Sequence, residues 1–385
     1  MKVLIYADKN KLKPIGGPYG YLYNLNLGLQ QIKNTSVHFL NENSDIRIKN
    51  DNSRLKKIKN KVWLPYFVLK SIFNNGKESK VNFKQYDIIH FNSTIDFYNN
   101  RKLLKNYTGK IVLTSHSPEA PYKEIYSMLK DANFCFSKQI ARFFEKADIY
   151  AFTHASYIIF PCKEAMAPYL HTWAYFRENY SVILSKSKFL ITGLARPKNI
   201  KPASLNFIKN RKKKFLVCYI GRHNKIKGYD LLLKAAKKIE KVDKSIEFIV
   251  AGKEMPLKHD KSLKNWHELG WINNPLEISK ACDLFVLPNR ETYFDLALIE
   301  ALATPADVLI SNTGGNDYFK KYNTDSINFF KSTNVEDLVR KILAIKHVGV
   351  TSEIKNKNLE IYNKDFKTET FAKAYINIMK EIEKN

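Results

Sequence analysis

Short apolar runs alternate with longer amphipathic segments along the whole 385-residue chain. The runs are strand-length, and most of the segments between them have room for a helix. Such alternation predicts an α/β protein whose parallel sheets are covered by helices on both faces. The expected strands are Val3–Ala7, Val37–Leu40, Ile88–Asn92, Ile111–Ser115, Tyr157–Phe160, Phe215–Ile220, Glu247–Ala251, Leu284–Leu287 and Val308–Ser311.

One stretch without periodicity divides the strand series into two. Residues 194–202 contain two prolines and no helical or alternating pattern, so we place a linker there. We therefore expect two Rossmann-like domains, residues 1–197 and 198–365, that enclose a cleft. Residues 366–385 have apolar positions at helical spacing and are expected to form a C-terminal helix.

Composition restricts the class of protein. Hydrophobic residues make up 44% of the chain and aromatic residues 13%, which excludes a largely disordered protein. No run of apolar residues is long enough for a membrane-spanning helix, and the first residues are too short for a signal-peptide core. The four cysteines are far apart, which indicates neither a disulfide framework nor a zinc site. We expect a cytoplasmic protein.

The net charge of +27 has two interpretations. A composition rich in Lys and Asn produces such a charge without any function. Two clusters stand out nonetheless: Arg47–Lys61, which precedes the apolar run Val62–Phe67, and Lys209–Lys214. Each is either a solvated face or a surface for an anionic membrane or a phosphate-bearing acceptor. A nucleic-acid-binding protein is a further alternative, although no nucleic-acid motif supports it.

The most informative stretch is Gly221–Gly228, which follows the predicted strand Phe215–Ile220 and opens the amphipathic segment Asp230–Lys241. It combines a glycine turn with the cations Arg222 and Lys227. Glycine lets the backbone approach a ligand closely, and the cations neutralise negative charge. The start of the following helix adds free N–H groups. The stretch therefore predicts a site for a phosphorylated ligand.

A second segment, Glu291–Glu300, places carboxylates at the start of another helix and inside it. A carboxylate accepts two hydrogen bonds at once and is suited to pairs of sugar hydroxyls. The candidate residues also follow predicted strands, and open parallel sheets bind ligands at the carboxyl ends of their strands. Together the two segments predict a protein that binds a nucleotide-sugar.

These residues resemble the donor-site signatures of the retaining glycosyltransferases of family 4, which have the GT-B fold. That family has Gly-Arg, four residues and Lys-Gly, and Arg222 and Lys227 match in identity and spacing. Glu300 matches the second glutamate of the family's Glu-x7-Glu block. The pair Gly314-Gly315 stands where the family often has two glycines, and Gly16-Gly17 stands where it has its first glycine loop.

The resemblance implies roles for these residues. Arg222 and Lys227 would hold the donor's diphosphate, and Glu300 would accept hydrogen bonds from the ribose hydroxyls. His116 would come from the first domain and lie near the donor sugar, although a lone histidine after a strand is often structural. Ile272 would lie beside the nucleobase. Gly16 and Gly17 would approach the donor or acceptor.

The resemblance also implies a C-terminal helix that crosses back to the first domain. No cofactor and no metal are expected, because fixed cations stabilise the leaving diphosphate and the sequence contains no Asp-x-Asp metal clamp.

The acidic block departs from the family pattern. If Phe294 and Leu296 align with the family's Phe-Gly-Leu, then Thr292 and not Glu291 stands where the first glutamate belongs. We favour Glu291 as the contact to the transferred sugar, and Thr292 is the alternative. Asp295 replaces the glycine of that motif, and we expect its side chain to turn to a sugar hydroxyl or to cap the following helix.

The sequence thus predicts a retaining hexosyltransferase. It would move a sugar from a UDP- or GDP-sugar to a saccharide or lipid-linked acceptor in cell-surface polysaccharide or glycoconjugate synthesis. The expected location is the cytoplasm, with peripheral association at the inner face of the membrane. The alternatives are a nucleotide-sugar epimerase or hydrolase of the same fold, a glycosyltransferase-like protein without catalysis, and the basic nucleic-acid-binding protein.

Overall fold

The computed structural model describes residues 1–14, 17–33, 36–41, 64–73, 81–349 and 351–385. The expected site residue Gly16 and the basic cluster at residues 47–61 lie outside these ranges. The chain forms two compact units. The first consists of Met1–Phe160, Pro168–Leu190 and Ala372–Asn385, and the second of Pro161–Ala167 and Ile191–Phe371. No helix of the described residues is long and apolar enough to cross a membrane.

The first unit contains a parallel sheet that has six strands among the described residues, in the order β2-β1-β3-β4-β5-β6. Its central strands are mostly apolar, as expected of strands that are covered on both faces. The strands are β1 (Val3–Asp8), β2 (Val37–Leu40), β3 (Ile88–Phe91), β4 (Lys110–Leu113), β5 (Tyr157–Phe160) and β6 (Ser187–Phe189). The named helices are α1 (Gly17–Gln30), α3 (Thr94–Asn100), α4 (Pro121–Asp131), α5 (Ser137–His154), α6 (Ala167–Thr172), α7 (Ala174–Glu178) and α8 (Tyr180–Ser185).

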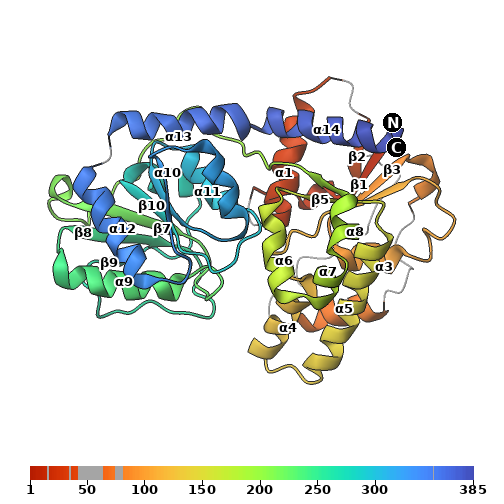
Figure 1. The fold of residues 1–385 in the computed structure, drawn as a ribbon, viewed down its shortest axis with the longest axis horizontal. Coiled ribbons are helices and arrows are strands. Elements are labelled where there is room, and N and C mark those ends of the chain that lie inside the picture. Colours follow the sequence, from red (N-terminus) through yellow and green to blue (C-terminus); the bar gives the residue numbers. More distant parts are fainter. Residues whose placement is uncertain (15–16, 34–35, 42–63, 74–80, 350) are drawn as a thin grey trace. The chain divides into compact units, whose positions relative to one another are not determined.

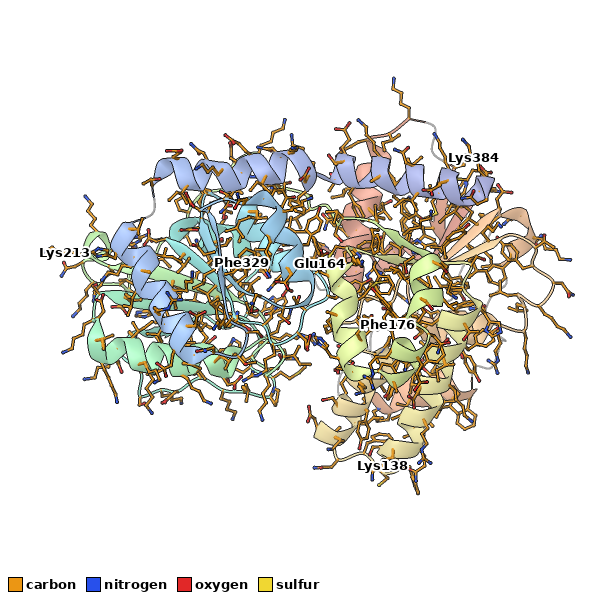
Figure 2. The ribbon with its side chains drawn as sticks, in the orientation of Figure 1. Lys138, Glu164, Phe176, Lys213, Phe329 and Lys384 are labelled. Carbon is orange, nitrogen blue, oxygen red and sulfur yellow. The ribbon has the colours of Figure 1, made fainter. Side chains whose placement is uncertain are left out.

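An aromatic cluster fills the space around α7 in the first unit. Phe176, which is labelled in Figure 2, is fully buried. Its ring lies 5.2 Å from that of Tyr169 and 6.0 Å from that of Phe152, measured between centroids. Aromatic side chains bury large apolar areas and favour tilted contacts of this kind. The short helices α6 and α7 are therefore held by side-chain packing.

The C-terminal helix α14 (Thr368–Lys384) belongs to the first unit from Ala372 onward. Its inner face is apolar, and Tyr375 at its middle lies fully buried. The Tyr375 hydroxyl is 3.1 Å from Nδ1 of the buried His90, whose Nε2 is 2.9 Å from the Thr114 hydroxyl. Near the end of the helix, Glu383 pairs with the amino group of Met1 at 2.9 Å. The last residues are thus part of the fold of the first unit.

The second unit contains a second parallel sheet, with six strands in the described part of the chain and the order β12-β11-β10-β7-β8-β9. Alternate residues of each central strand point into two separate apolar clusters. The cluster of Val217, Phe248 and Val286 packs under α9 and α12, and the cluster of Cys218 and Phe285 packs under α10, α11 and α13. Figure 1 shows these helices on the two faces of the sheet.

The bounds of these elements follow the apolar pattern closely. The strands are β7 (Phe215–Ile220), β8 (Ile246–Ala251), β9 (Trp266–Glu268), β10 (Leu284–Leu287), β11 (Asp307–Ser311) and β12 (Ile327–Phe330). The α-helices are α9 (Tyr229–Val242), α10 (Pro275–Ala281), α11 (Leu296–Leu302), α12 (Val335–Val348) and α13 (Ser352–Asp365). The 3-10 helices of the whole chain, as far as it is described, are η1 (Lys9–Lys11), η2 (Phe83–Gln85), η3 (Glu164–Met166), η4 (Arg211–Lys213) and η5 (Gly314–Tyr322).

All nine predicted strands are present, to within about two residues at each end. The segment expected to be a linker is packed onto the second unit, where the Leu194 amide donates to the Phe366 carbonyl at 2.8 Å and the Arg196 guanidinium donates to the Ala303 carbonyl at 2.6 Å. The second basic cluster is partly structural. Lys214 pairs with Glu247 at 2.9 Å, whereas Lys213 projects from the unit (Figure 2).

Candidate functional site

The strand order of the second sheet identifies where a ligand is expected to bind. From β7 the chain proceeds outward to β8 and β9, and then returns to place β10 on the other side of β7. Such a switch point opens a crevice at the carboxyl ends of the two strands. The stretch Gly221–Gly228 follows β7, and the acidic block Glu291–Glu300 follows β10. The two predicted segments therefore meet at the switch point.

The loop after β7 is tightly built around Gly228. This residue has φ +66°, and a Cβ atom there would lie 1.7 Å from the Pro288 carbonyl oxygen, so only glycine fits. Within the loop, the Asn224 carboxamide oxygen accepts from the Lys227 amide at 2.8 Å, and the Asn224 carbonyl accepts from the Tyr229 amide at 3.2 Å. The expectation of free N–H groups at this helix start is therefore wrong for these two amides.

Arg290, which sequence reasoning missed, ties the two loops together. Its guanidinium binds both carboxylate oxygens of Asp230, in the first turn of α9, at 2.7 Å each. Its own amide donates to the Ile226 carbonyl at 2.8 Å. Such a bidentate pair fixes geometry as well as adding energy. The signal that could have identified Arg290 is its place three residues after the end of β10.

Lys227 is held by Asp295 in the structure. The Lys227 Nζ atom lies 2.6 and 2.7 Å from the two carboxylate oxygens of Asp295. The carboxamide of the fully buried Asn289 donates to the same carboxylate. Burial alone would raise the pKa of Asp295, but Lys227 and Asn289 outweigh it and the pKa is lowered, so the carboxylate is ionised.

Asp295 stands at the N-cap position of α11, but its side chain makes no capping hydrogen bond. The expectation that it caps this helix is wrong, because Lys227 and Asn289 bind the carboxylate instead. The other expectation for Asp295, a contact to a sugar hydroxyl, stays a prediction.

Glu300 lies on α11 five residues after Asp295. No hydrogen bond or ion pair joins its carboxylate to another residue in the described part of the chain. Burial, with the nearby charge of Asp295, raises the pKa of Glu300 to about 7. A half-buried carboxylate without a protein partner beside the switch point retains its capacity to accept hydrogen bonds from a ligand.

The loop before α11 distinguishes Glu291 from Thr292. The Thr292 side chain is buried, and its carbonyl accepts from the Gly315 amide at 3.1 Å. Glycine is required at 315 because a Cβ atom would lie 2.0 Å from the Tyr293 carbonyl oxygen. Glu291 is partly exposed at the same loop. Thr292 is thus part of the contact between this loop and η5, and Glu291 has the more accessible side chain.

Three other expected donor-site residues pack against the core of the second unit. The Phe294 ring stacks on that of Phe319, with centroids 5.5 Å apart. Leu296 and Ile272 are half-buried beside the same apolar cluster. Each therefore has a structural contact that anchors its loop. Trp271, next to Ile272, is 61% exposed and stands near the carboxyl end of β9.

The first unit positions His116 after β4. The residue adopts φ +58°, a left-handed conformation that is uncommon for a residue with a side chain. Its Nε2 lies 2.9 Å from the Asn92 carboxamide oxygen, and its ring contacts that of Tyr21 edge-on at 4.5 Å. Burial lowers the pKa of His116 to about 3, so the imidazole is neutral. Asn92, directly after β3, is a second residue that sequence reasoning missed.

Gly17 begins α1, and a Cβ atom there would meet nothing within 4 Å, so no close contact within the chain requires glycine at this position.

The described side chains of the chain include no group of three or more His, Cys, Asp or Glu residues that could hold a metal ion. The chemistry available at the switch point is therefore that of two cations, Arg222 and Lys227, with the carboxylates Glu291, Asp295 and Glu300. Arg222 is exposed, and its carbonyl accepts from the Tyr219 hydroxyl at 2.9 Å.

Comparisons with known proteins agree with this arrangement. Residues 201–365, most of the second unit, match the family described as glycosyl transferases group 1. No curated protein matches the chain by sequence.

Solved structures of similar fold cover nearly the whole chain. Sucrose-phosphate synthase from Thermosynechococcus elongatus has a TM-score of 0.63 and 16% identity, over 99% of each chain. HepE from Anabaena, crystallised with UDP-glucose, has a TM-score of 0.63 and 13% identity, over 99% of this chain and all of that one. The lipopolysaccharide outer core galactosyltransferase WaaB has a TM-score of 0.58 and 12% identity, over 99% of each chain.

The chain therefore has the GT-B fold, as predicted, with a glycosyl transferases group 1 domain in its second unit. We conclude that it is a glycosyltransferase.

Proposed function

We propose that the protein transfers a hexose from a nucleotide diphosphate sugar to an acceptor hydroxyl with retention of the anomeric configuration. The donor binds at the switch point between β7 and β10. Arg222 and Lys227 contact its diphosphate, Glu300 its ribose, and Glu291 the transferred sugar.

The observation that carries the proposal is the arrangement of Lys227 and Glu300 around Asp295. Lys227, a half-buried cation, follows β7, and Glu300, a carboxylate without a protein hydrogen-bond partner, lies on α11 at the same switch point. The cation suits the diphosphate, and the carboxylate suits a pair of hydroxyls. A nucleotide diphosphate sugar presents both groups a few bonds apart. UDP-sugars are the first donors to test, because HepE was crystallised with UDP-glucose.

In the transfer, the acceptor oxygen bonds to the anomeric carbon on the face from which the diphosphate departs. The bond between that carbon and the phosphate oxygen breaks, and the leaving phosphate accepts the acceptor's proton. Arg222 and Lys227 stabilise the charge that develops on the diphosphate. The cations supply this stabilisation from the chain itself, and the proposed reaction is therefore independent of a metal.

The proposed acceptor is a saccharide, free or on a lipid carrier, in the synthesis of a cell-surface glycoconjugate. The similarity in fold to WaaB, which acts on the outer core of lipopolysaccharide, makes such acceptors a reasonable first set. The basic clusters of the sequence favour a site of action at an anionic membrane surface on the cytoplasmic side.

The test is a transfer reaction followed by NMR. Purified protein is incubated with an α-linked UDP-hexose and a panel of saccharide acceptors, and the anomeric coupling constant of the product is measured. An α-linked product supports retention, and a β-linked product would refute it. Conversion of the donor into its epimer without any acceptor would instead identify an epimerase.

A further inference from the structure

The helix formed by residues 64–73 in the first unit has an apolar inner face. Val68 is 2% exposed, and the Phe67 ring stacks on that of Phe144 in α5, with centroids 5.7 Å apart and planes 12° from parallel. Leu64 and Ile72 pack into the same cluster. These residues account for the attachment of the helix to its unit. Phe67, which ends the apolar run after the first basic cluster, is therefore directed into the protein and not toward a membrane.

The outer face of the same helix is also apolar. Tyr66 is 48% exposed, Leu69 54% and Phe73 74%. These residues and the exposed Lys70 stand at positions i, i+3, i+4 and i+7, so they form one stripe along the helix. We call these four residues the outer stripe. Large apolar side chains that line up in this way mark a surface that binds something.

The charge of the outer stripe and of the adjoining sequence identifies the partner. The outer stripe contains a lysine and no acidic residue, and the sequence that leads into the helix has seven Lys and Arg residues between positions 47 and 61. An apolar stripe in a basic context is complementary to a bilayer with anionic headgroups. The lysine can place its stem on the apolar surface and its ammonium among the headgroups.

We propose that the outer stripe docks the protein on a membrane that contains anionic lipid. Tyr66, Leu69 and Phe73 insert between the headgroups, and Lys70 adds positive charge beside them. This inference rests on the proposed function in one point only: the membrane would present the lipid-linked acceptor. The docking itself does not depend on transfer. A protein partner is less well matched. Besides Lys70, the Tyr66 hydroxyl is the one polar group of the outer stripe that can make directional hydrogen bonds.

The experiment is flotation of the full chain with vesicles of phosphatidylcholine alone or with about 30 mol% phosphatidylglycerol. The substitutions Leu69→Asp and Phe73→Asp, singly and combined, are compared with Val242→Asp and Val348→Asp, singly and combined. The two control sites are exposed valines, at 68% and 76%, and lie in the second unit. All four substitutions introduce the same charge at an exposed apolar site. Thermal unfolding and binding of UDP are measured for each, so that loss of the fold or of the donor site is recognised separately.

The expected result is binding to the anionic vesicles that falls about tenfold or more in the double variant Leu69→Asp/Phe73→Asp and little in the double control. Equal binding of both double variants would overturn the proposal, and so would the absence of binding to any vesicle. A dimer that forms without lipid and dissociates in Leu69→Asp/Phe73→Asp would overturn it as well, because a second copy would then cover the outer stripe. None of these outcomes depends on transferase activity.

Discussion

The ammonium group of Lys227 lies 2.6 Å from Oδ1 and 2.7 Å from Oδ2 of Asp295, so one carboxylate holds the cation expected to bind the donor diphosphate. Asp295 stands where the Phe-Gly-Leu motif of glycosyltransferase family 4 has glycine. Both side chains are less than a quarter exposed. In the proposed site, the donor diphosphate would thus bind a lysine that already has an anionic partner. The motif alone does not predict this competition between Asp295 and phosphate.

The first prediction concerns the two cations. Arg222→Ala and Lys227→Ala should each lower kcat/KM for transfer by about 100-fold or more, because each removes a group that stabilises the leaving diphosphate (about 3 kcal/mol). Steady-state kinetics with saturating acceptor measures the effect. Lys225→Ala, at an exposed position in the same loop, is the control. Near-normal turnover in both cation variants would remove the assigned site.

The second prediction concerns Asp295. The Asp295→Asn variant keeps a hydrogen-bonding group beside Lys227 but removes the negative charge that competes with phosphate. The affinity for UDP should rise by roughly fivefold, about 1 kcal/mol, at low salt. Isothermal titration calorimetry measures it, and uridine, which has no phosphate, is the control ligand. Weaker binding of UDP in Asp295→Asn would show that the carboxylate positions Lys227 for the ligand and does not compete.

The third prediction is a pH dependence that arises from Glu300. The pKa of this carboxyl is raised from 4.5 to about 7 in the folded protein. The ionised form accepts two hydroxyl hydrogen bonds, so the affinity for UDP should increase between pH 6 and pH 8. The diphosphate also titrates, and Glu300→Gln measured over the same range corrects for it. The same slope in both proteins would exclude Glu300 from the ribose site.

Glu300 also makes the free energy of unfolding depend on pH, and this quantity should fall with rising pH while the affinity for UDP rises. Because the folded state holds this proton more tightly than the unfolded chain, its contribution is fully present below about pH 4.5. It is lost as the pH rises to about 7. In Glu300→Gln, the free energy of unfolding should therefore decline less over this range than in the native protein, as measured by urea denaturation at several pH values. A parallel decline in both would show that the carboxyl is not perturbed.

The fourth prediction concerns Arg290. Loss of its bidentate bond to Asp230 in Arg290→Ala leaves a half-buried carboxylate, at 23% exposure, without its partner. We expect a loss of about 1–3 kcal/mol in unfolding free energy and a lower Tm. Arg340→Ala is the control, since Arg340 is 66% exposed in its pair with Asp337 and should change stability little. Equal effects of the two variants would contradict the role of Arg290 in joining the loops.

The sequence predicted the central strands and the edge strand β2, and missed the other edge strands of the described residues. The strands β6, β9 and β12, which were not expected, each lie at the edge of a sheet. An edge strand is covered less completely, so Ser187–Phe189 and Ile327–Phe330 contain polar residues and lack a continuous apolar run. The central strands are buried on both faces and are visible as mostly apolar segments.

The site could be predicted only in part, because sequence patterns are local and contacts between loops are not. Motif spacing selected Lys227 and Glu300 as candidate contacts to a ligand. The side chains that hold them, Asn289 and Arg290, act through contacts between loops that are distant in sequence. Whether Asp295 caps its helix or binds Lys227 depends on which groups the fold brings near, and local sequence favours the cap.

The most direct test of the central claim is calorimetric titration of the native protein and of Arg222→Ala and Lys227→Ala with UDP, UDP-glucose, GDP and GDP-mannose, in buffer with EDTA. The account predicts that one nucleotide family binds the native protein at one site without a metal, and that both variants lose at least tenfold in affinity while remaining folded. Unchanged affinity in both variants, or binding that requires added magnesium, would contradict it.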